Sequence, residues 1–152
     1  MPLRVIVVVL LLGLAFALAD MVETDADCTY TCPLKGHEPL PRPGHKKTSN
    51  GCGTAELPLH RSILPMPEFE ICCNHHDMCY DTCGADRFQC DNNFLRCMMD
   101  LCWNKYDPVT NDMTQDECKS TARMFHQLAL GAGCPAYLRS QENACHCVKE
   151  EL

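Results

Sequence analysis

The chain has 152 residues, a formal net charge of −7 and 14 cysteines. Long-range electrostatic fields do not draw so acidic a protein to nucleic acid or to anionic bilayers, so both are excluded as electrostatically steered partners. The length is typical of one domain.

The N-terminus predicts an export signal. Arg4 precedes an apolar run from Val5 to Ala19, which ends in a small-x-small pattern. The alternative is a membrane span, but the run is shorter than the ~20 apolar residues that cross a bilayer, and acidic residues follow it. We therefore expect residues 1–19 to be a signal peptide and residues 20–152 to be one secreted domain without a transmembrane segment.

The cysteines and prolines indicate the fold class. All 14 cysteines follow the predicted signal, and an even number in an exported chain is typical of a disulfide framework. Residues 20–67 carry most of the prolines and are expected to be loop-rich. From residue 68 to 152 apolar residues recur at helical spacing. We therefore expect a mainly α, disulfide-rich fold.

Three helices are expected in the second half of the chain, each marked by apolar periodicity and by its own start or stop signal. They extend from about Glu68 to Cys83, from about Arg87 to Lys105, and from a capping box at Thr114 and Glu117 to about Gly131. No repeat and no β-alternation competes with this interpretation.

The second helix carries a carboxylate on its apolar stripe. Asp91 precedes Phe94, Leu95 and Met98 by three, four and seven residues, so it points inward if the helix packs by that face. A buried carboxylate needs a partner. The alternative is that Asp91 caps its own backbone near the start of the helix.

Cysteine spacing suggests that partner. Each of the first two helices has two cysteines seven residues apart, and these are Cys72 and Cys79, and Cys90 and Cys97. Bonds from Cys72 to Cys97 and from Cys79 to Cys90 would lock the helices antiparallel. In that register Asp91 comes within reach of the His76 ring. Sequence alone leaves the connectivity open, so the pairing is a hypothesis.

A cysteine between two glycines predicts a metal-binding loop. Cys73 lies one helical turn before Asp77, and Cys52 is its natural partner. A Cys52–Cys73 bond would lay the turn 50–55 against Asp77. Carbonyl oxygens and one carboxylate would then form the oxygen cage that calcium prefers. The alternative is that the glycines beside Cys52 only form a tight turn at a crosslink.

The order of these motifs resembles that of a secreted phospholipase A2, most closely the group XII branch. The central motifs are Gly51-Cys52-Gly53, Cys72-Cys73-Asn74-His75-His76-Asp77-Met78-Cys79-Tyr80, and Cys90-Asp91 followed by Cys97. The closer match rests on Cys28-Thr29-Tyr30-Thr31-Cys32, Asn50-Gly51-Cys52-Gly53, Asp81-Thr82-Cys83-Gly84 and Ala144-Cys145-His146-Cys147. The resemblance implies two long antiparallel, disulfide-linked helices, a third helix and a calcium-binding loop.

The resemblance also implies an activity, which is calcium-dependent hydrolysis of the sn-2 ester of glycerophospholipids at a membrane or micelle surface. It makes His76 the general base for water, Asp91 the residue that fixes the His76 tautomer, and Tyr80 the support of Asp91. The implied Ca²⁺ ligands are Asp77 and the carbonyl oxygens of Gly51, Gly53 and Ala55. The Gly53 amide is the implied oxyanion donor. We expect the protein to be a monomer.

Other histidines and cysteines have simpler interpretations. His75 and His76 point about 100° apart on a helix, so only one can face Asp91, and the position before Asp77 selects His76. The histidines without a surrounding motif are read as ordinary polar residues, namely His37, His45, His60 and His126. Two short cysteine motifs, Cys145-His146-Cys147 and Cys28-x-x-x-Cys32, could bind zinc, but an oxidising compartment favours disulfides.

Two functions besides the enzyme remain open. One is a calcium-dependent lipid carrier or receptor ligand that keeps the scaffold with negligible turnover. The other is a purely structural disulfide module. The enzyme is favoured because His76, Asp77, Asp91 and Tyr80 are all present.

Overall fold

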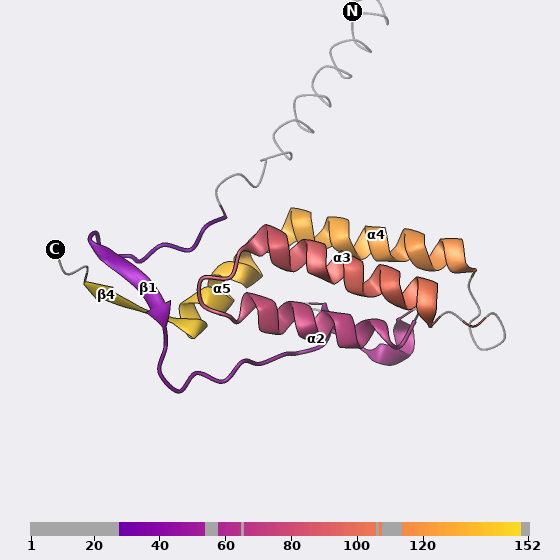
Figure 1. Cartoon of the computed structure of the whole chain (residues 1–152), viewed down its shortest axis with the longest axis horizontal. Coiled ribbons are helices and arrows are strands. Elements are labelled where there is room, and N and C mark those ends of the chain that lie inside the picture. Colours follow the sequence, from indigo (N-terminus) through magenta and orange to yellow (C-terminus); the bar gives the residue numbers. More distant parts are fainter. Residues whose placement is uncertain (1–27, 54–57, 65, 106, 108–113, 150–152) are drawn as a thin grey trace, which may run out of the picture.

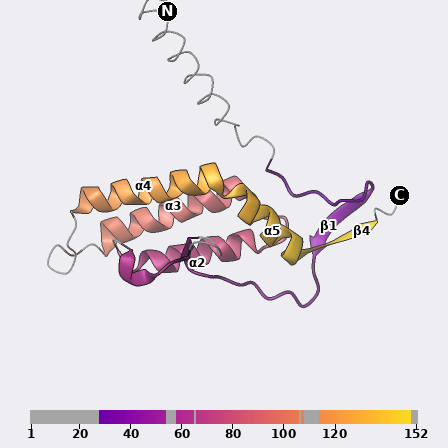
Figure 2. The same ribbon diagram turned by 180° about the vertical axis from the view of Figure 1, so that it is seen from behind.

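Three long helices lie side by side in the computed structural model, with α3 (Arg87–Asn104) between α2 (Phe69–Tyr80) and α4 (Gln115–Ala132) (Figure 1). The view from behind shows the same order, with the shorter α5 (Cys134–Ala144) at one end of the layer (Figure 2). The structure describes residues 28–53, 58–64, 66–105, 107 and 114–149. Within these residues the fold is mainly helical and disulfide-rich, as the sequence predicts.

The helix boundaries follow local capping chemistry. Asp86 caps α3 by accepting a hydrogen bond from the Gln89 N–H at 2.7 Å. The predicted capping box of α4 is present. The prediction for α2 was too long, because the helix ends at Tyr80 rather than Cys83. The chain leaves the helix in a turn through Gly84, whose φ of 76° is a left-handed conformation that favours glycine.

All three hypothesised disulfides are present: Cys52–Cys73, Cys72–Cys97 and Cys79–Cys90. The last two join α2 to α3 at two levels, so the antiparallel register is fixed covalently. The remaining bonds, whose pairing could not be predicted, are Cys28–Cys134, Cys32–Cys147, Cys83–Cys145 and Cys102–Cys118. Both short cysteine motifs are therefore oxidised, which contradicts the zinc alternative.

Helix α5 and a β-ribbon were not expected from the sequence. Strand β1 (His37–Pro41) pairs antiparallel with β4 (Cys145–Lys149), and Pro39 lies opposite Cys147. Prolines are tolerated here because each strand of a two-stranded ribbon has a free edge. A second short pair joins β2 (Cys52–Gly53) to β3 (Pro58–Leu59). The half of the chain expected to be loop therefore contains strands, and a short 3₁₀ helix, η1, at Arg61–Ile63.

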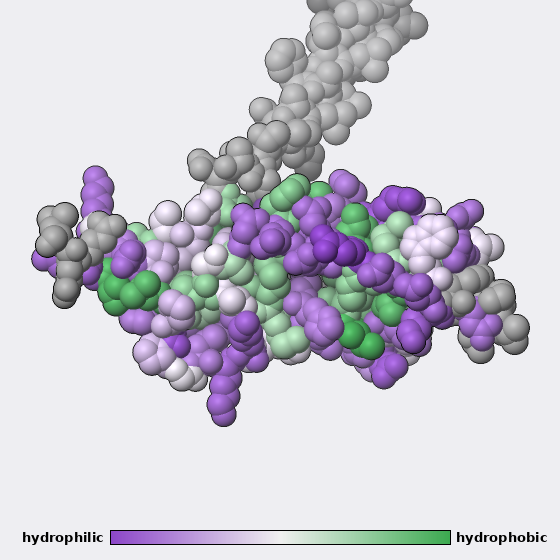
Figure 3. Space-filling model, in the orientation of Figure 1, coloured by the Kyte–Doolittle hydropathy of each residue, from purple (hydrophilic) through white to green (hydrophobic). Residues whose placement is uncertain are grey.

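The core lies between the three long helices and the chain before α2. Phe69 from α2 and Met98 from α3 are fully buried there, and Phe69 contacts the ring of Phe125 of α4 at 6.1 Å between centroids. On the face seen in Figure 3, apolar patches are separated by polar side chains. Among the described residues, none of the helices combines the length and hydropathy that a bilayer crossing requires. The predicted signal peptide, residues 1–19, lies outside the described residues.

Candidate active site

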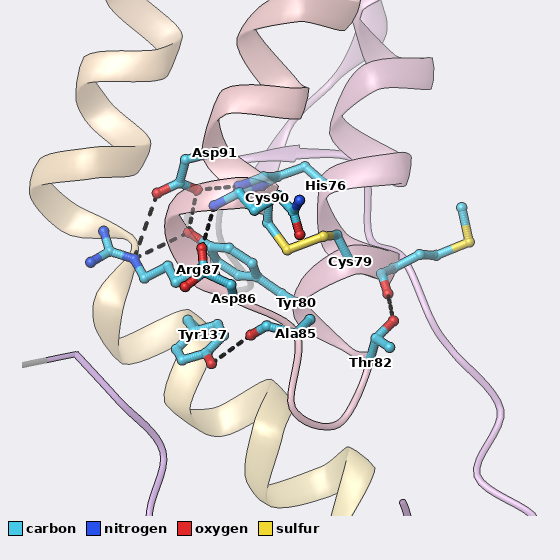
Figure 4. The surroundings of a disulfide bond; sticks show 12 residues. His76, Cys79, Tyr80, Thr82, Ala85, Asp86, Arg87, Cys90, Asp91 and Tyr137 are labelled. Atoms are coloured by element: carbon cyan, nitrogen blue, oxygen red, sulfur yellow. Dashed lines mark hydrogen bonds and ion pairs between the residues drawn. A yellow bond between two sulfur atoms is a disulfide. The ribbon is translucent and has the colours of Figure 1, made fainter.

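The centre of the site is a hydrogen bond between helices α2 and α3. Nε2 of His76 lies 2.6 Å from Oδ1 of Asp91, which confirms the register deduced from the cysteine spacing. The Cys79–Cys90 disulfide lies beside this contact (Figure 4). Asp91 is fully buried, so it points inward and does not cap its own helix. An ionised carboxylate only accepts hydrogen bonds, so Nε2 carries a proton, and in the neutral ring Nδ1 keeps its lone pair.

Tyr80 supports the carboxylate from one turn further along α2. Its hydroxyl donates to Oδ1 of Asp91 at 2.6 Å. Burial, followed by this hydrogen bond, raises the pKa of Tyr80 well above its usual value. Tyr80 therefore remains a protonated donor at any physiological pH, which is the role that the resemblance implied.

Aromatic side chains hold the imidazole in place. The ring of His76 stacks on Phe94 with 4.7 Å between centroids and lies 4.2 Å from the ring of Tyr80. The exposed fraction of the His76 side chain is 12%. A ring packed on two sides and hydrogen-bonded at Nε2 has little freedom to rotate, so Nδ1 is held in one direction.

The glycine loop lies against Asp77, as the Cys52–Cys73 bond requires. The Asn50 N–H donates to Oδ2 of Asp77 at 2.9 Å, and the Gly51 N–H donates to Oδ1 of Asn74 at 3.1 Å. Gly51 and Gly53 have φ of 83° and 96°, a left-handed region that L side chains rarely adopt. The loop therefore needs glycine at both positions to pass beside the carboxylate.

These residues fit a Ca²⁺ ion. Burial raises the pKa of Asp77, only partly opposed by the hydrogen bond from Asn50 and the charge of His76. A cation beside this carboxylate would offset its lost hydration. Asn50, Gly53 and Asp77 also line a cavity of about 380 Å³. Among the described residues no group of three or more His, Cys, Asp or Glu side chains gathers, so carbonyl oxygens would have to complete the shell. Ala55, the third expected carbonyl ligand, lies outside the described residues.

A second His–Asp pair, which the sequence analysis missed, anchors this loop. His45 Nε2 lies 2.9 Å from Oδ1 of Asp81, and the backbone N–H and hydroxyl of Thr48 donate to Oδ2. Asp81 directly follows α2. The pair therefore ties the segment before the glycine loop to the end of the helix that carries His76. His45 and Asp81 are 36 positions apart, so no local sequence pattern indicates this contact.

Arg87 is a further residue of the site that sequence reasoning missed. Its Nε lies 3.7 Å from Oδ2 of Asp91, and both residues are buried. The spacing of four residues on one helix was the available signal, since side chains so spaced lie on one face. Of the other histidines, His75 is exposed on α2, as expected, whereas His126 is buried in α4.

Gly133 packs against the site and gives a stability prediction. A methyl group at this position would overlap the Ala129 carbonyl oxygen and lie 2.7 Å from the Tyr80 hydroxyl. We expect Gly133→Ala to lower the free energy of unfolding by about 1–3 kcal/mol, because neighbouring groups must shift. Gly131→Ala is the matched control, since nothing lies within 4 Å of its added carbon. Urea unfolding that found the two variants equally stable would contradict this packing.

The amino-acid sequence is similar to those of known proteins. A model of the family described as group XII secretory phospholipase A2 precursor matches residues 11–152. The group XIIA secretory phospholipases A2 of Mus musculus and Homo sapiens are each 35% identical over 128 residues, which is 84% of this chain. The group XIIB secretory phospholipase A2-like protein of Mus musculus is 35% identical over 131 residues, or 82% of this chain.

The matched regions are 66%, 67% and 66% of those three relatives, so the chain spans about two thirds of their length. No solved structure matches the chain. The family model covers far more than half of the chain, and the relatives agree with it. The chain therefore belongs to the group XII secretory phospholipase A2 family.

Proposed function

We propose that the protein is a secreted, calcium-dependent phospholipase A2 that hydrolyses the sn-2 ester of glycerophospholipids. The observation that carries this proposal is the 2.6 Å contact between Nε2 of His76 and the buried carboxylate of Asp91. Asp77 follows His76 directly and faces the glycine loop, so a base and a cation ligand stand side by side. The names of the relatives support the substrate class.

The proton steps follow from the orientation of the imidazole. With Nε2–H bound to Asp91, Nδ1 of His76 takes a proton from water, and the oxygen of that water attacks the ester carbonyl. Asp91 stabilises the imidazolium that forms, and Tyr80 keeps Asp91 in position. The Nδ1 proton then passes to the departing sn-2 oxygen. One water and one ester thus give a lysophospholipid and a fatty acid.

The negative charge that develops on the ester carbonyl oxygen needs hydrogen-bond donors to stabilise it. The Gly53 N–H is the proposed donor from the chain. Asp77 and the carbonyl oxygens of Gly51, Gly53 and Ala55 would hold Ca²⁺ there. When bound, the ion supplies Lewis-acid polarisation of the ester carbonyl.

We also propose that residues 20–152 act outside the cell as one monomeric domain after removal of residues 1–19. All 14 cysteines lie within the described residues, and they form seven disulfides with no free thiol. Such a framework persists in oxidising compartments and not in the cytosol. The phospholipid would be met at a membrane or micelle surface.

The direct test uses two phosphatidylcholines labelled separately in the sn-1 and sn-2 acyl chains. We expect the oxidised protein to release labelled fatty acid from the sn-2 substrate with Ca²⁺ present and not with EGTA. Release from the sn-1 substrate should stay at background. Calcium-dependent lipid binding without release would favour the carrier or receptor-ligand function. Absence of any response to calcium would favour a structural module.

A further inference from the structure

Arg87, in the first turn of α3, has a buried side chain that reaches three helices. Its Nε lies 3.7 Å from Oδ2 of Asp91 and 3.4 Å from the hydroxyl of Tyr80. Its Nη2 donates to the carbonyl oxygens of Ala129 and Leu130 at 2.8 and 2.7 Å. Figure 4 shows the guanidinium beside Asp91 and Tyr80, on the side away from His76.

The two oxygens of Asp91 have different surroundings. Oδ1 accepts from both His76 and Tyr80. Oδ2 is buried and has no hydrogen-bond partner among the described residues, and Arg87 is the charged group that faces it. A fully buried carboxylate is costly without a counter-charge. The imidazole carries a positive charge only while it is protonated, whereas a guanidinium is always charged.

The last turn of α4 fixes the direction of the guanidinium. Carbonyl oxygens at the end of a helix lack partners within the helix and carry partial negative charge, so they attract a cation. Nη2 of Arg87 donates to the carbonyl oxygens of Ala129 and Leu130 in this turn, and the Ala129 oxygen also accepts from the Gly133 N–H. Nε is thereby left to donate to the Tyr80 hydroxyl and to lie 3.7 Å from Oδ2 of Asp91 as its ion-pair partner. The side chain therefore has two separable functions, an anchor on α4 and a charge beside Asp91.

We propose that Arg87 is a positioning residue for the His76–Asp91 pair. Its positive charge offsets the burial of the Asp91 carboxylate and orients it, with Oδ1 toward His76. The inference rests on the proposed function, because it assigns the support of the general base to a residue outside the motif Cys72–Tyr80. Tyr80 of α2 then donates a hydrogen bond to Oδ1 of Asp91, whereas Arg87 of α3 places a positive charge beside Oδ2.

Three substitutions separate the charge of Arg87 from its hydrogen-bonding capacity. Arg87→Lys keeps the positive charge, Arg87→Gln keeps an uncharged N–H donor near the position of Nε, and Arg87→Met removes both. Arg96→Met is the matched control, since Arg96 is exposed on the same helix. Each oxidised variant is assayed for kcat and KM on dispersed short-chain phosphatidylcholine. Its melting temperature and its downfield ¹H NMR signal from the His76 Nε2 proton are measured in parallel.

We expect Arg87→Met to lower kcat on the order of 10²-fold with KM changed less than about twofold, because a misplaced catalytic group costs rate rather than binding. The Nε2 proton signal should broaden or move upfield. Arg87→Lys should recover at least about a tenth of the wild-type kcat and exceed Arg87→Gln, since only the lysine restores charge. Arg96→Met should match the wild type in every measurement.

The inference is overturned if Arg87→Gln turns over faster than Arg87→Lys, or if Arg87→Met keeps the wild-type kcat and Nε2 proton signal. A loss of rate that only follows a lower melting temperature, with the Nε2 signal unchanged, also overturns it, because the role would then be structural. Failure of the proposed function looks different. The wild type would release no fatty acid, whereas the Nε2 signal would still report whether Arg87 orients the pair.

Discussion

His76→Gln is expected to lower fatty-acid release by about 10²–10⁴-fold, the range that a positioned general base contributes. Glutamine has no group that can take a proton from water at neutral pH. Its amide can still donate toward Asp91, so the buried carboxylate keeps a hydrogen-bond partner in place of the 2.6 Å contact. The loss should therefore appear in kcat, with little change in melting temperature.

The neighbouring histidine provides the matched control. His75 lies on the same helix but is exposed, so His75→Gln makes the same chemical change outside the site. We expect this variant to keep wild-type turnover and wild-type stability. Fatty-acid release is measured on the same dispersed phospholipid for the wild type, His76→Gln and His75→Gln. Equal losses in the two variants, or a His76→Gln rate within tenfold of the wild type, would remove His76 from the role of general base.

Regular periodicity explains what could be predicted from the sequence. A helix rises by a constant amount per residue, and equal cysteine spacings of seven on α2 and α3 permit one double crosslink. That crosslink sets the register, and the register brings Asp91 to His76. Local repetition thus predicted both the helix pair and its central contact. The Cys52–Cys73 bond was predicted because Cys73 lies on the same helix face as Asp77, one turn before it.

Long-range contacts explain most of what was missed. The Cys28–Cys134 and Cys32–Cys147 bonds join residues 106 and 115 positions apart, and no local pattern selects such partners. The β1–β4 ribbon likewise forms only when two segments far apart in the sequence come together. His45 and Asp81 meet only because the segment before the glycine loop returns along α2.

Two missed features did have local signals. Helix α5 starts at Cys134 and has Pro135 in its first turn, a position that proline favours in helices. Arg87 stands four residues before Asp91, the spacing of an ion pair on one helix face. Gly131 and Gly133 are typical of a helix end, and they outweighed the proline signal for α5.

We expect Ca²⁺ to raise the melting temperature of the wild type, and Asp77→Asn to abolish that rise. The same substitution should lower turnover on the order of 10²-fold or more, because it removes the proposed carboxylate ligand and with it the charge stabilisation that a bound ion would supply. At about 100 times its dissociation constant, an ion that binds only the folded state adds roughly 2.7 kcal/mol to stability. Asp100→Asn is the matched control, since Asp100 is exposed on α3. A calcium response kept in Asp77→Asn would exclude Asp77 as a ligand.

Without calcium the same substitution should have the opposite effect on stability. Burial raises the pKa of Asp77 in the folded protein above its ordinary value of 3.8, so the protonated form favours folding and the ionised form opposes it. The stabilising contribution is present below the unfolded pKa and is lost as pH rises through the folded pKa.

At neutral pH, calcium-free Asp77→Asn should therefore melt above the wild type, by on the order of 1–3 °C. Below pH 4 the difference should shrink. Melting curves in EGTA that place the variant below the wild type at pH 7 would mean that the hydrogen bond from Asn50 outweighs the cost of burying the charge.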